Sequence, residues 1–283
     1  ADNLVNSTQP KVKTNQDREP LLRVDSLSIA FGGVQALNNL ELEIQSGTIS
    51  SIIGPNGAGK TTFFNLVSGF YQPTGGEIFF RGQSITSLPG HKRGALGIAR
   101  TFQNIALFRG MSVLDNIKLG AHSHLKTGVF GAGIYFRLAQ HEELQLRETI
   151  EREIIDFLEI DHIRNSPVSA LPYGLQKRVE LARALAMRPS MMLLDEPVAG
   201  MNREEREDTA RFILDIQEQW GTTILLVDHD MGMVMDISDQ VFVFNFGELI
   251  AAGKPEIIQS DPAVIEAYLG REKSDISRHI KTQ

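Results

Sequence analysis

The chain has 283 residues, a formal net charge of −7 and a sequence pI of about 5.6. This acidic balance argues against a protein whose main task is to coat nucleic acid. The chain contains no cysteine, which excludes structural disulfides and zinc sites built on cysteine.

The first 20 residues are polar and show no hydrophobic periodicity, so we predict a flexible tail there. They lack the apolar segment of a signal peptide, and no apolar run in the chain approaches the ~18 residues of a membrane span. Any role at a membrane is therefore expected to depend on a partner. Order is predicted to begin at "LLRVDSLSIAF", from residue 21.

The next segments read as strands of two kinds. "LNNLELEIQSG" alternates apolar and acidic residues, which predicts a half-exposed, antiparallel strand, and "GEIFFRGQSI" predicts another strand followed by a turn. In contrast, "TISSIIG", "MMLLDE" and "TTILLVDHD" do not alternate, as is typical of strands covered on both faces. Because helix-like segments separate these runs, we predict an α/β fold with a parallel core sheet.

Residues 104–170 show helical periodicity and few strand signals, which predicts a helical insertion between two halves of the α/β core. Within it, "EELQLRETIEREIIDFLEI" predicts an amphipathic helix. Its apolar side would carry Leu146, Ile150, Ile154, Phe157 and Leu158. Near the end of the chain, "DQVFVFNFGELIAAG" predicts two short strands around a turn at Gly247. The predicted domain spans 21–270, followed by a tail over 271–283.

The segment "GPNGAGKTT" follows the buried strand "TISSIIG" and fits the phosphate-binding pattern GxxxxGK[ST]. In such a loop, glycines let backbone N–H groups surround phosphate oxygens, and the following helix adds its positive end. Lys60 is expected to reach the β- and γ-phosphates of ATP, and the Thr61 hydroxyl to ligate Mg²⁺. A chance glycine-rich turn is disfavoured, because a strand precedes the pattern and a helix follows it. The residues predicted to bind the nucleotide are Gly54, Pro55, Asn56, Gly57, Ala58, Gly59, Lys60, Thr61 and Thr62.

A second buried strand ends in Asp195, at the sheet edge where ligands bind in open α/β sheets. Asp195 is predicted to hold Mg²⁺ through water, as in P-loop NTPases. The neighbouring Glu196 would orient or deprotonate the attacking water. Its alternative role, a solvated acid or a helix cap, is disfavoured by the P-loop and the "LLD" that precedes it.

Three further residues are candidates for the same site. Gln103 follows the short strand "GIARTF" and could reach Mg²⁺ or water with its amide; otherwise it is a surface amide. His229 ends another buried strand and could donate a hydrogen bond to the γ-phosphate; alone, it would read as an ordinary polar residue at a strand end. Phe31 could stack on adenine, against the alternative of a core phenylalanine.

The ordered series "AFGG", "GPNGAGKTT", "TFQN", "LPYGLQKR", "MMLLDEP", "AGMN" and "VDHD" resembles the ATP-binding subunit of an ABC transporter over about residues 21–270. The resemblance implies a P-loop ATPase fold with an N-terminal antiparallel β-subdomain and an inserted helical subdomain. It also implies a head-to-tail dimer, in which Tyr173 and Gly174 close over ATP bound to the other subunit. Gln103 and the insertion would then contact the membrane subunit.

Further segments, including "ARTFQNIALFRGMSVLDNI" and "EPVAGMN", resemble the larger ATPase subunit of branched-chain amino-acid importers. The implied partners are a second ATPase subunit (in a hetero- or homodimer), two transmembrane permease subunits and, indirectly, an extracytoplasmic substrate-binding protein, with no nucleic acid. The implied location is the cytoplasmic face of the inner membrane, where the chain would be peripheral.

Two departures and two alternatives belong with this resemblance. Pro172 stands where such subunits usually have serine, which removes a hydroxyl and a backbone N–H. It can still serve as the first residue of the helix that follows. Asn202 stands where many have aspartate, a change expected to weaken communication across the dimer. The first alternative is the ATPase of a lipopolysaccharide or lipid exporter. The second is a soluble ATPase of the same type acting on DNA or ribosomes, which the short insertion and the single P-loop disfavour.

Overall fold

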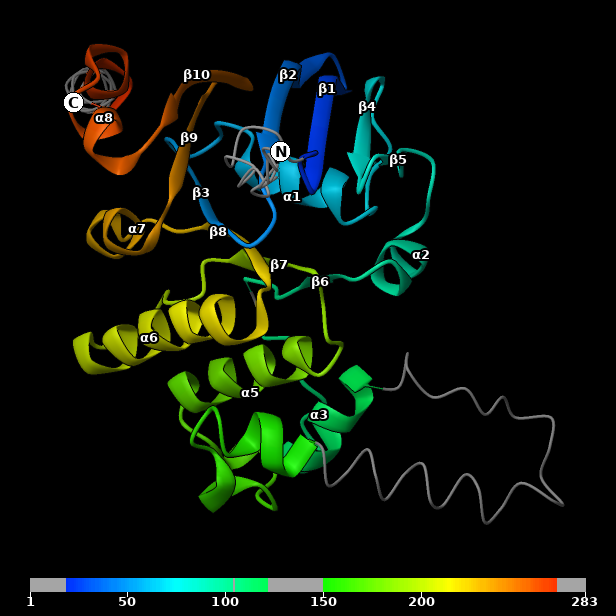
Figure 1. The fold of residues 1–283 in the computed structure, drawn as a ribbon, viewed down its shortest axis with the longest axis vertical. Helices are drawn as coiled ribbons and strands as arrows, with labels where there is room; N and C mark the ends of the chain where they lie inside the picture. Colours follow the sequence, from blue (N-terminus) through cyan, green and yellow to red (C-terminus); the bar gives the residue numbers. More distant parts are fainter. Residues whose placement is uncertain (1–18, 104, 122–149, 269–283) are drawn as a thin grey trace, which may run out of the picture.

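The computed structural model describes residues 19–103, 105–121 and 150–268, which fold around two β-sheets (Figure 1). The first sheet has the order β2-β1-β4-β5, and its neighbouring strands pair antiparallel. Its strands are β1 (Leu22–Phe31), β2 (Val34–Ile44), β4 (Gly75–Phe80) and β5 (Gln83–Ser84). The second sheet contains β3 (Ile49–Ile53), β6 (Ile98–Arg100), β7 (Met191–Asp195), β8 (Thr223–Val227), β9 (Gln240–Asn245) and β10 (Glu248–Gly253).

The second sheet has the order β10-β9-β3-β8-β7-β6 and is the core of the fold. Strands β9, β3, β8, β7 and β6 run parallel, whereas β10 pairs antiparallel with β9. All five residues of β3, of β7 and of β8 are buried, in agreement with the unbroken runs in the sequence. The predicted fold class is confirmed, and β10 is antiparallel because a tight turn at Phe246 and Gly247 returns the chain beside β9.

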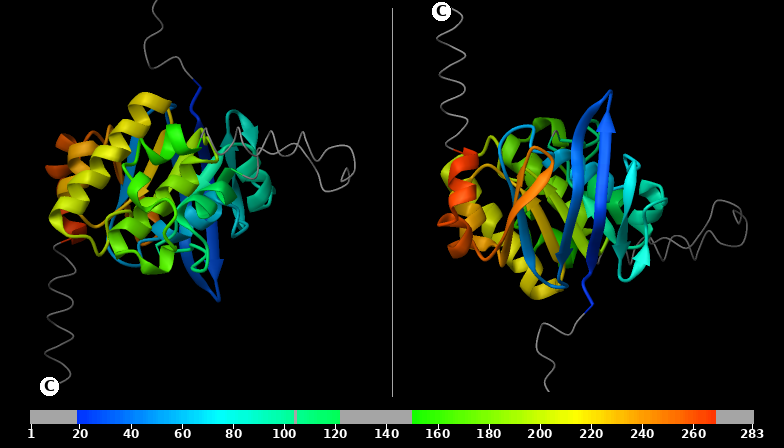
Figure 2. Two further views of the ribbon diagram at one scale, coloured as in Figure 1. Left: turned by 90° about the horizontal axis from the view of Figure 1, so that it is seen from below. Right: turned by 90° about the horizontal axis from the view of Figure 1, so that it is seen from above.

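The helices lie on both faces of the core sheet. They are α1 (Lys60–Val67), α2 (Gly90–Ala95), α3 (Val113–Ala121), α5 (Tyr173–Leu185), α6 (Arg203–Trp220), α7 (Met231–Ile237) and α8 (Pro255–Gln259), with short turns η4 (Glu151–Ile155), η5 (Asp161–Ile163) and η6 (Val168–Ala170). The two views of Figure 2 show α5 and α6 on the side of the core sheet away from β1 and β2.

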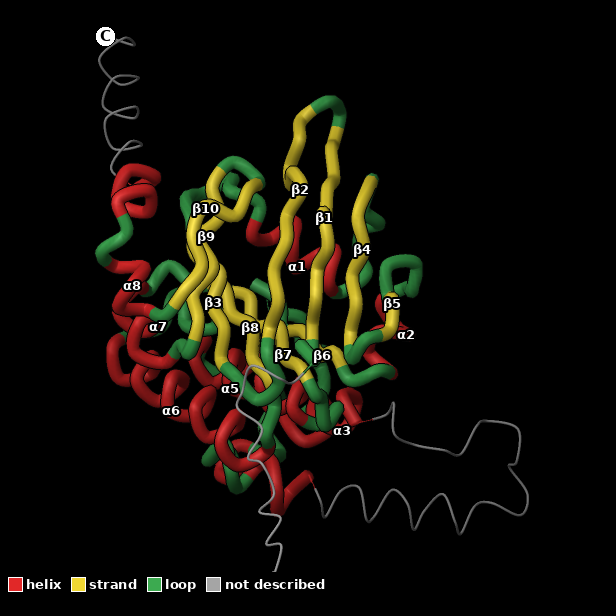
Figure 3. The backbone as a smooth tube through the Cα atoms, turned by 45° about the horizontal axis from the view of Figure 1, so that its top comes forward, coloured by secondary structure: helices red, strands yellow, loops and turns green. Residues whose placement is uncertain are grey.

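The hydrophobic core has two parts, one on each face of the core sheet. Between the two sheets, α1 contributes Phe63 and Phe64, which are fully buried with residues of β1 and β2. On the opposite face, α3, α5, α6 and α7 cover the sheet (Figure 3). Neighbouring residues of β7 serve both parts, because Leu193 belongs to the first and Leu194 to the second. Alternate side chains point to opposite faces of a strand, so β7 is apolar from Met191 to Leu194, before it ends in Asp195.

Two predicted elements differ from the structure. The amphipathic helix predicted over 142–160 is described only from residue 150. Residues 151–155 form the π-helix η4. The chain then leaves the helical path, and Glu159 has φ +57°. Of its predicted apolar residues, Ile150, Ile154 and Leu158 are buried, whereas Leu146 lies outside the described residues. Residues 1–18 and 269–283 also lie outside the described residues; they include most of the tail predicted over 1–20 and all of the tail predicted over 271–283. Among the described helices, none is long and apolar enough to cross a membrane.

The start of α5 is one residue later than predicted. Pro172 is not the first helical residue but the N-cap, with extended backbone (ψ 155°). Its carbonyl accepts the first helical hydrogen bond, from the N–H of Gln176 at 3.1 Å. An N-cap residue keeps non-helical backbone angles while its carbonyl joins the helix, and it needs no N–H of its own. Consequently, Tyr173 and Gly174 form the first turn of α5.

Candidate functional site

The predicted phosphate-binding loop connects β3 to α1, and its shape depends on two glycines. Gly54 has φ +147° and Gly59 has φ +105°. A Cβ atom would lie 2.1 Å from the carbonyl oxygen of Phe244 at Gly54, and 2.8 Å from that of Ala36 at Gly59. Both positions therefore require glycine, and the backbone packs closely against the first residues of β2 and the end of β9.

Lys60 lies inside this loop. Its Nζ donates hydrogen bonds to the carbonyl oxygens of Gly54 (2.6 Å) and Pro55 (3.1 Å), which holds the ammonium group in the concave side of the turn. Among the described residues, no side chain caps the N-terminus of α1, and the positive end of its helix dipole favours an anion at this place. The loop therefore combines the features that bind a polyphosphate.

Three neighbouring parallel strands bring the other predicted residues to the same edge. The register places Ile52 of β3 beside Val227 of β8, and Val227 beside Asp195 of β7. As a result, the residues that follow these strands, Gly54, His229 and Glu196, emerge side by side. The alignment satisfies the expectation that a ligand site forms where parallel strands end.

Glu196 is the point at which three predicted residues meet. Its backbone has φ +50°, and its N–H donates to the carbonyl oxygen of Val227 at 2.7 Å. One carboxylate oxygen accepts a hydrogen bond from Nε2 of Gln103 at 2.9 Å, and the other lies 3.0 Å from Nε2 of His229. The structure therefore brings Gln103, Glu196 and His229, from three different strand ends, into direct contact.

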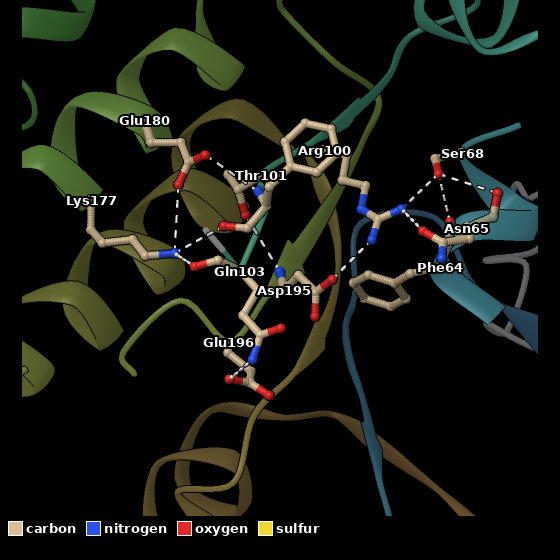
Figure 4. A network of polar contacts seen from close by, with 11 residues as sticks. Phe64, Asn65, Ser68, Arg100, Thr101, Gln103, Lys177, Glu180, Asp195 and Glu196 are labelled. Carbon is tan, nitrogen blue, oxygen red and sulfur yellow. Dashed lines mark hydrogen bonds and ion pairs between the residues drawn. The ribbon is translucent and has the colours of Figure 1, made fainter. Parts of the chain in front are cut away.

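Asp195 is held by a residue that the sequence did not single out. Its side chain forms a 2.9 Å ion pair with Arg100, and both side chains are less than a tenth exposed (Figure 4). The same guanidinium donates to Oδ1 of Asn65 (2.7 Å) and to Oγ of Ser68 (2.8 Å) on the α1 side. The ring of Phe102 lies 5.2 Å from it. A planar fork suits this task, because it reaches a carboxylate and two other acceptors at once.

Replacing Arg100 by Met should destabilise the protein strongly, because it leaves the buried Asp195 carboxylate without its partner. Breaking a buried ion pair costs about 3–5 kcal/mol of unfolding free energy. For a domain of this size, that loss lowers Tm by roughly 6–20 °C. Thermal unfolding followed by circular dichroism measures the change. The matched control is Arg203→Met, in an exposed pair with Glu207 (87% and 66%), which should shift Tm by at most about 3 °C. Equal shifts for both variants would contradict the role of Arg100.

The oxygen donors predicted to hold Mg²⁺, those of Asp195, Thr61 and Gln103, suit a hard cation. Asp195 offers a carboxylate whose Oδ2 accepts from Arg100, and Thr61 and Gln103 offer a hydroxyl and an amide oxygen. Such oxygens are what Mg²⁺ prefers, and it is usually held by one or two protein groups together with substrate phosphates. In the described parts of the chain, no three His, Cys, Asp or Glu side chains form a metal-binding cluster of their own. The donor set therefore fits a metal that arrives with a nucleotide.

Phe31 lies at the end of β1 and is 43% exposed, so it is not the core residue of the alternative interpretation. Its ring packs edge-on against Tyr71, with centroids 5.1 Å apart. Tyr71 is also exposed and was not singled out in the sequence. Together the two rings form an aromatic surface that could hold a nucleobase by stacking.

Tyr173 and Gly174 do not join this cluster; they begin α5 and pack against the loop before α6. The Tyr173 ring lies beside Gly200, where a Cβ atom would be 3.3 Å from Cε1 of the ring. A Cβ at Gly174 would be 2.3 Å from a carboxylate oxygen of Glu205. Burial, together with the charges of Glu180 and Glu196, raises the pKa of the Tyr173 phenol, which stays protonated at neutral pH.

Asn202, the second departure from the family pattern, lies in the loop before α6 and is the N-cap of that helix. Its side chain accepts a hydrogen bond from the N–H of Glu205 at 3.0 Å, and the Glu205 carboxylate accepts one from the N–H of Asn202 at 3.0 Å. This reciprocal pair is a capping box at the start of α6. An asparagine serves as N-cap as well as an aspartate, so the departure leaves the local fold intact.

Asp228, in "VDHD", is a further residue of the site that the sequence analysis did not predict. It is buried, and its carboxylate accepts hydrogen bonds from the N–H groups of Val198, His229 and Asp230 at 3.3, 2.7 and 2.9 Å. Burial raises the pKa of Asp228, and the three N–H bonds oppose that effect. The carboxylate fixes the backbone that presents His229. The sequence signal that could have identified Asp228 is its position directly before His229, at the end of a buried strand.

The fold and this site define a class of protein: a P-loop ATPase with a phosphate loop after β3 and acidic residues after β7. Comparison with known proteins narrows the class. Residues 37–199 match the family model described as ABC transporter, and residues 248–274 match the one described as branched-chain amino acid ATP-binding cassette transporter.

The matches to two curated relatives span nearly the whole length of each relative. The chain is 46% identical over 256 residues to the high-affinity branched-chain amino acid transport ATP-binding protein LivG of Escherichia coli K12, covering 89% of this chain and 98% of the relative. It is 35% identical to the probable LivG of Archaeoglobus fulgidus, covering 90% and 98%.

Solved structures agree. A nucleotide-free ATP-binding cassette from an ABC transporter superposes with a TM-score of 0.76 at 30% identity, covering 88% of this chain and 99% of that one. The ADP conformation of the cassette MJ1267 gives a TM-score of 0.76 at 28% identity, covering 89% and 100%. The chain belongs to the ATP-binding proteins of ABC transporters, and its activity is ATP hydrolysis coupled to transport.

Proposed function

We propose that this chain is the ATP-hydrolysing subunit of an importer for branched-chain amino acids or related small molecules. The observation that carries the proposal is the 46% identity to a branched-chain amino acid transport protein along 98% of its length. The separate match of residues 248–274 to a C-terminal family of such transporters supports it. The lipid-exporter alternative receives no such support from either observation.

We assign ATP binding to the loop after β3 and to Phe31. The Lys60 ammonium would leave the two carbonyl oxygens that now hold it and neutralise the β- and γ-phosphates, and Phe31 with Tyr71 would stack on the adenine. Mg²⁺, when bound, supplies positive charge at the phosphates, and Thr61, Gln103 and Asp195 would hold it. The remaining predicted contacts are Gly54, Pro55, Asn56, Gly57, Ala58, Gly59 and Thr62.

We assign the hydrolytic step to Glu196, assisted by His229 and Gln103. A water oxygen attacks the γ-phosphorus and forms the new P–O bond, while the bond from that phosphorus to the β–γ bridging oxygen breaks. Glu196 accepts the proton of the water, and ADP leaves with the bridging oxygen. The contacts of Glu196 with Gln103 (2.9 Å) and His229 (3.0 Å) would fix the carboxylate for this task. His229 would donate a hydrogen bond to the γ-phosphate.

We propose that the chain works as a dimer with a second ATPase subunit, bound to two transmembrane permeases at the cytoplasmic face of the inner membrane. An extracytoplasmic binding protein would deliver the substrate to the permeases. Tyr173, 44% exposed at the start of α5, and the neighbouring Gly174 would face ATP bound to the partner ATPase. Among the described residues, no side chain caps the start of α5, which favours this role because uncapped N–H groups at a helix start can bind an anion.

Purification from native membranes tests the proposed function. The expected result is that two permeases and a second ATPase subunit co-purify, and that a binding protein loaded with leucine, isoleucine or valine stimulates ATP turnover. Co-purification of proteins that bridge to an outer membrane would favour the exporter instead. Recovery of the chain with no membrane protein would contradict both transport readings.

A further inference from the structure

The helix that begins with Tyr173 also holds the backbone that carries Gln103. One turn into α5, Nζ of Lys177 donates hydrogen bonds to the carbonyl oxygens of Phe102 (2.9 Å) and Gln103 (3.0 Å) (Figure 4). Three residues later, one carboxylate oxygen of Glu180 accepts from the N–H groups of Phe102 (3.3 Å) and Ala106 (3.4 Å). A donor and an acceptor on one face of α5 therefore bind the backbone of the same segment, which contains Phe102, Gln103 and Ala106.

These two charged side chains are almost completely buried, with Lys177 5% and Glu180 1% exposed. They form an ion pair at 3.6 Å. Burial raises the pKa of Glu180, and the charge of Lys177 with the two N–H bonds opposes that rise. Well-packed apolar residues would stabilise such a place about as well as an ion pair. The pair is therefore better explained by its contacts with the Gln103 backbone than by a gain in stability.

A third residue on the same face of α5 extends the grip. The guanidinium of Arg183 donates to the carbonyl oxygen of Ala106 at 2.6 Å. Lys177, Glu180 and Arg183 are spaced by three residues, which places them along one side of the helix. They attach α5 to this segment at successive turns.

At its other end, the gripped segment reaches the hydrolytic carboxylate, since Nε2 of Gln103 donates to Glu196 at 2.9 Å. We propose that Lys177 and Glu180 are positioning residues for Gln103, and that they make its contact with Glu196 depend on the position of α5. This inference rests on the proposed roles of Gln103, Glu196 and the first turn of α5. A helix moves as a rigid unit, so a shift at Tyr173 carries Lys177 and Glu180 with it. The segment that they hold then withdraws Gln103 from Glu196 or returns it.

A double-mutant cycle on the assembled transporter complex tests the proposal. Lys177→Met removes the ammonium and keeps an unbranched apolar stem; the second variant is Gln103→Ala, and the third carries both. Lys177→Met should lower kcat for ATP about 10-fold, with KM changed less than about 2-fold, because the nucleotide contacts of the P-loop are untouched. In the Gln103→Ala background, the same change should lower kcat less than about 2-fold, because the positioned group is already gone.

Two controls separate positioning from loss of structure. Lys177→Arg keeps the cation and its donors and should retain most of the activity, and Arg203→Met, at an exposed helical ion pair, should leave kcat unchanged. Unfolding temperatures of all variants show whether the fold is kept. If Lys177→Met does not assemble, the isosteric Glu180→Gln takes its place in the same cycle.

The proposal is overturned if Lys177→Met lowers kcat by the same factor in the Gln103→Ala background as in the wild type. It is also overturned if Lys177→Met raises KM and leaves kcat unchanged. If Gln103→Ala alone leaves turnover unchanged, the assignment of Gln103 itself fails. Because the readout is ATP hydrolysis, an error in the proposed transported substrate leaves the cycle interpretable.

Discussion

Glu196→Gln is expected to stop ATP turnover while leaving ATP binding in place. The substitution keeps the shape of the side chain and its neighbours Gln103 and His229, but an amide cannot accept the proton of the attacking water. Loss of a general base typically lowers kcat by about 10²–10⁴-fold. The affinity for ATP should change less than about 3-fold, because Glu196 lies outside the phosphate loop. Phosphate release by the assembled complex and equilibrium binding of ATP measure the two quantities.

The matched control for this variant is Glu207→Gln. Glu207 is 66% exposed on α6 and pairs only with Arg203 among the described residues, so its neutralisation should leave turnover within about 2-fold. Turnover of the Glu196 variant near the wild-type rate would show that another group accepts the proton. A variant that loses ATP affinity as well would place Glu196 in nucleotide binding rather than in the hydrolytic step.

The cluster around Glu196 was predictable because it depends on short-range pattern and topology. Unbroken apolar runs predict strands covered on both faces, and parallel strands end at a common edge. Gly54 and Glu196 follow such a run directly and His229 lies one residue further on, so their proximity follows from the order of β3, β8 and β7. The glycine pattern of the phosphate loop likewise reports backbone angles that other residues rarely adopt.

The partners of the cluster were not predictable in the same way. Arg100 lies 95 residues from Asp195 in the chain, and Lys177 lies 75 from Phe102. Nothing in the local pattern says that these charges are buried, since a lysine in "LQKRVELARAL" reads as a solvated residue of an amphipathic helix. Their roles become visible only when α5, β6 and β7 are packed together. The same limit explains Pro172, because a one-residue difference at a helix end depends on cap geometry.

Lys60→Ala is expected to abolish ATP binding at concentrations that saturate the wild-type protein. Lys60 is only 7% exposed, and its Nζ lies 2.6 Å from the carbonyl oxygen of Gly54, at the centre of the phosphate loop. Each hydrogen bond to a charged group contributes about 1.5–3 kcal/mol, so losing contacts to two phosphates should weaken Kd at least about 100-fold. Isothermal titration of the purified variant measures this change in Kd.

Lys92→Ala, at an exposed lysine of α2, serves as control and should bind ATP like the wild type. Unchanged affinity in a Lys60→Ala protein that unfolds at the wild-type temperature would refute phosphate binding by this loop. Lost affinity with a preserved Tm would instead locate the effect in the ammonium group, because the backbone that surrounds it is fixed independently by Gly54 and Gly59.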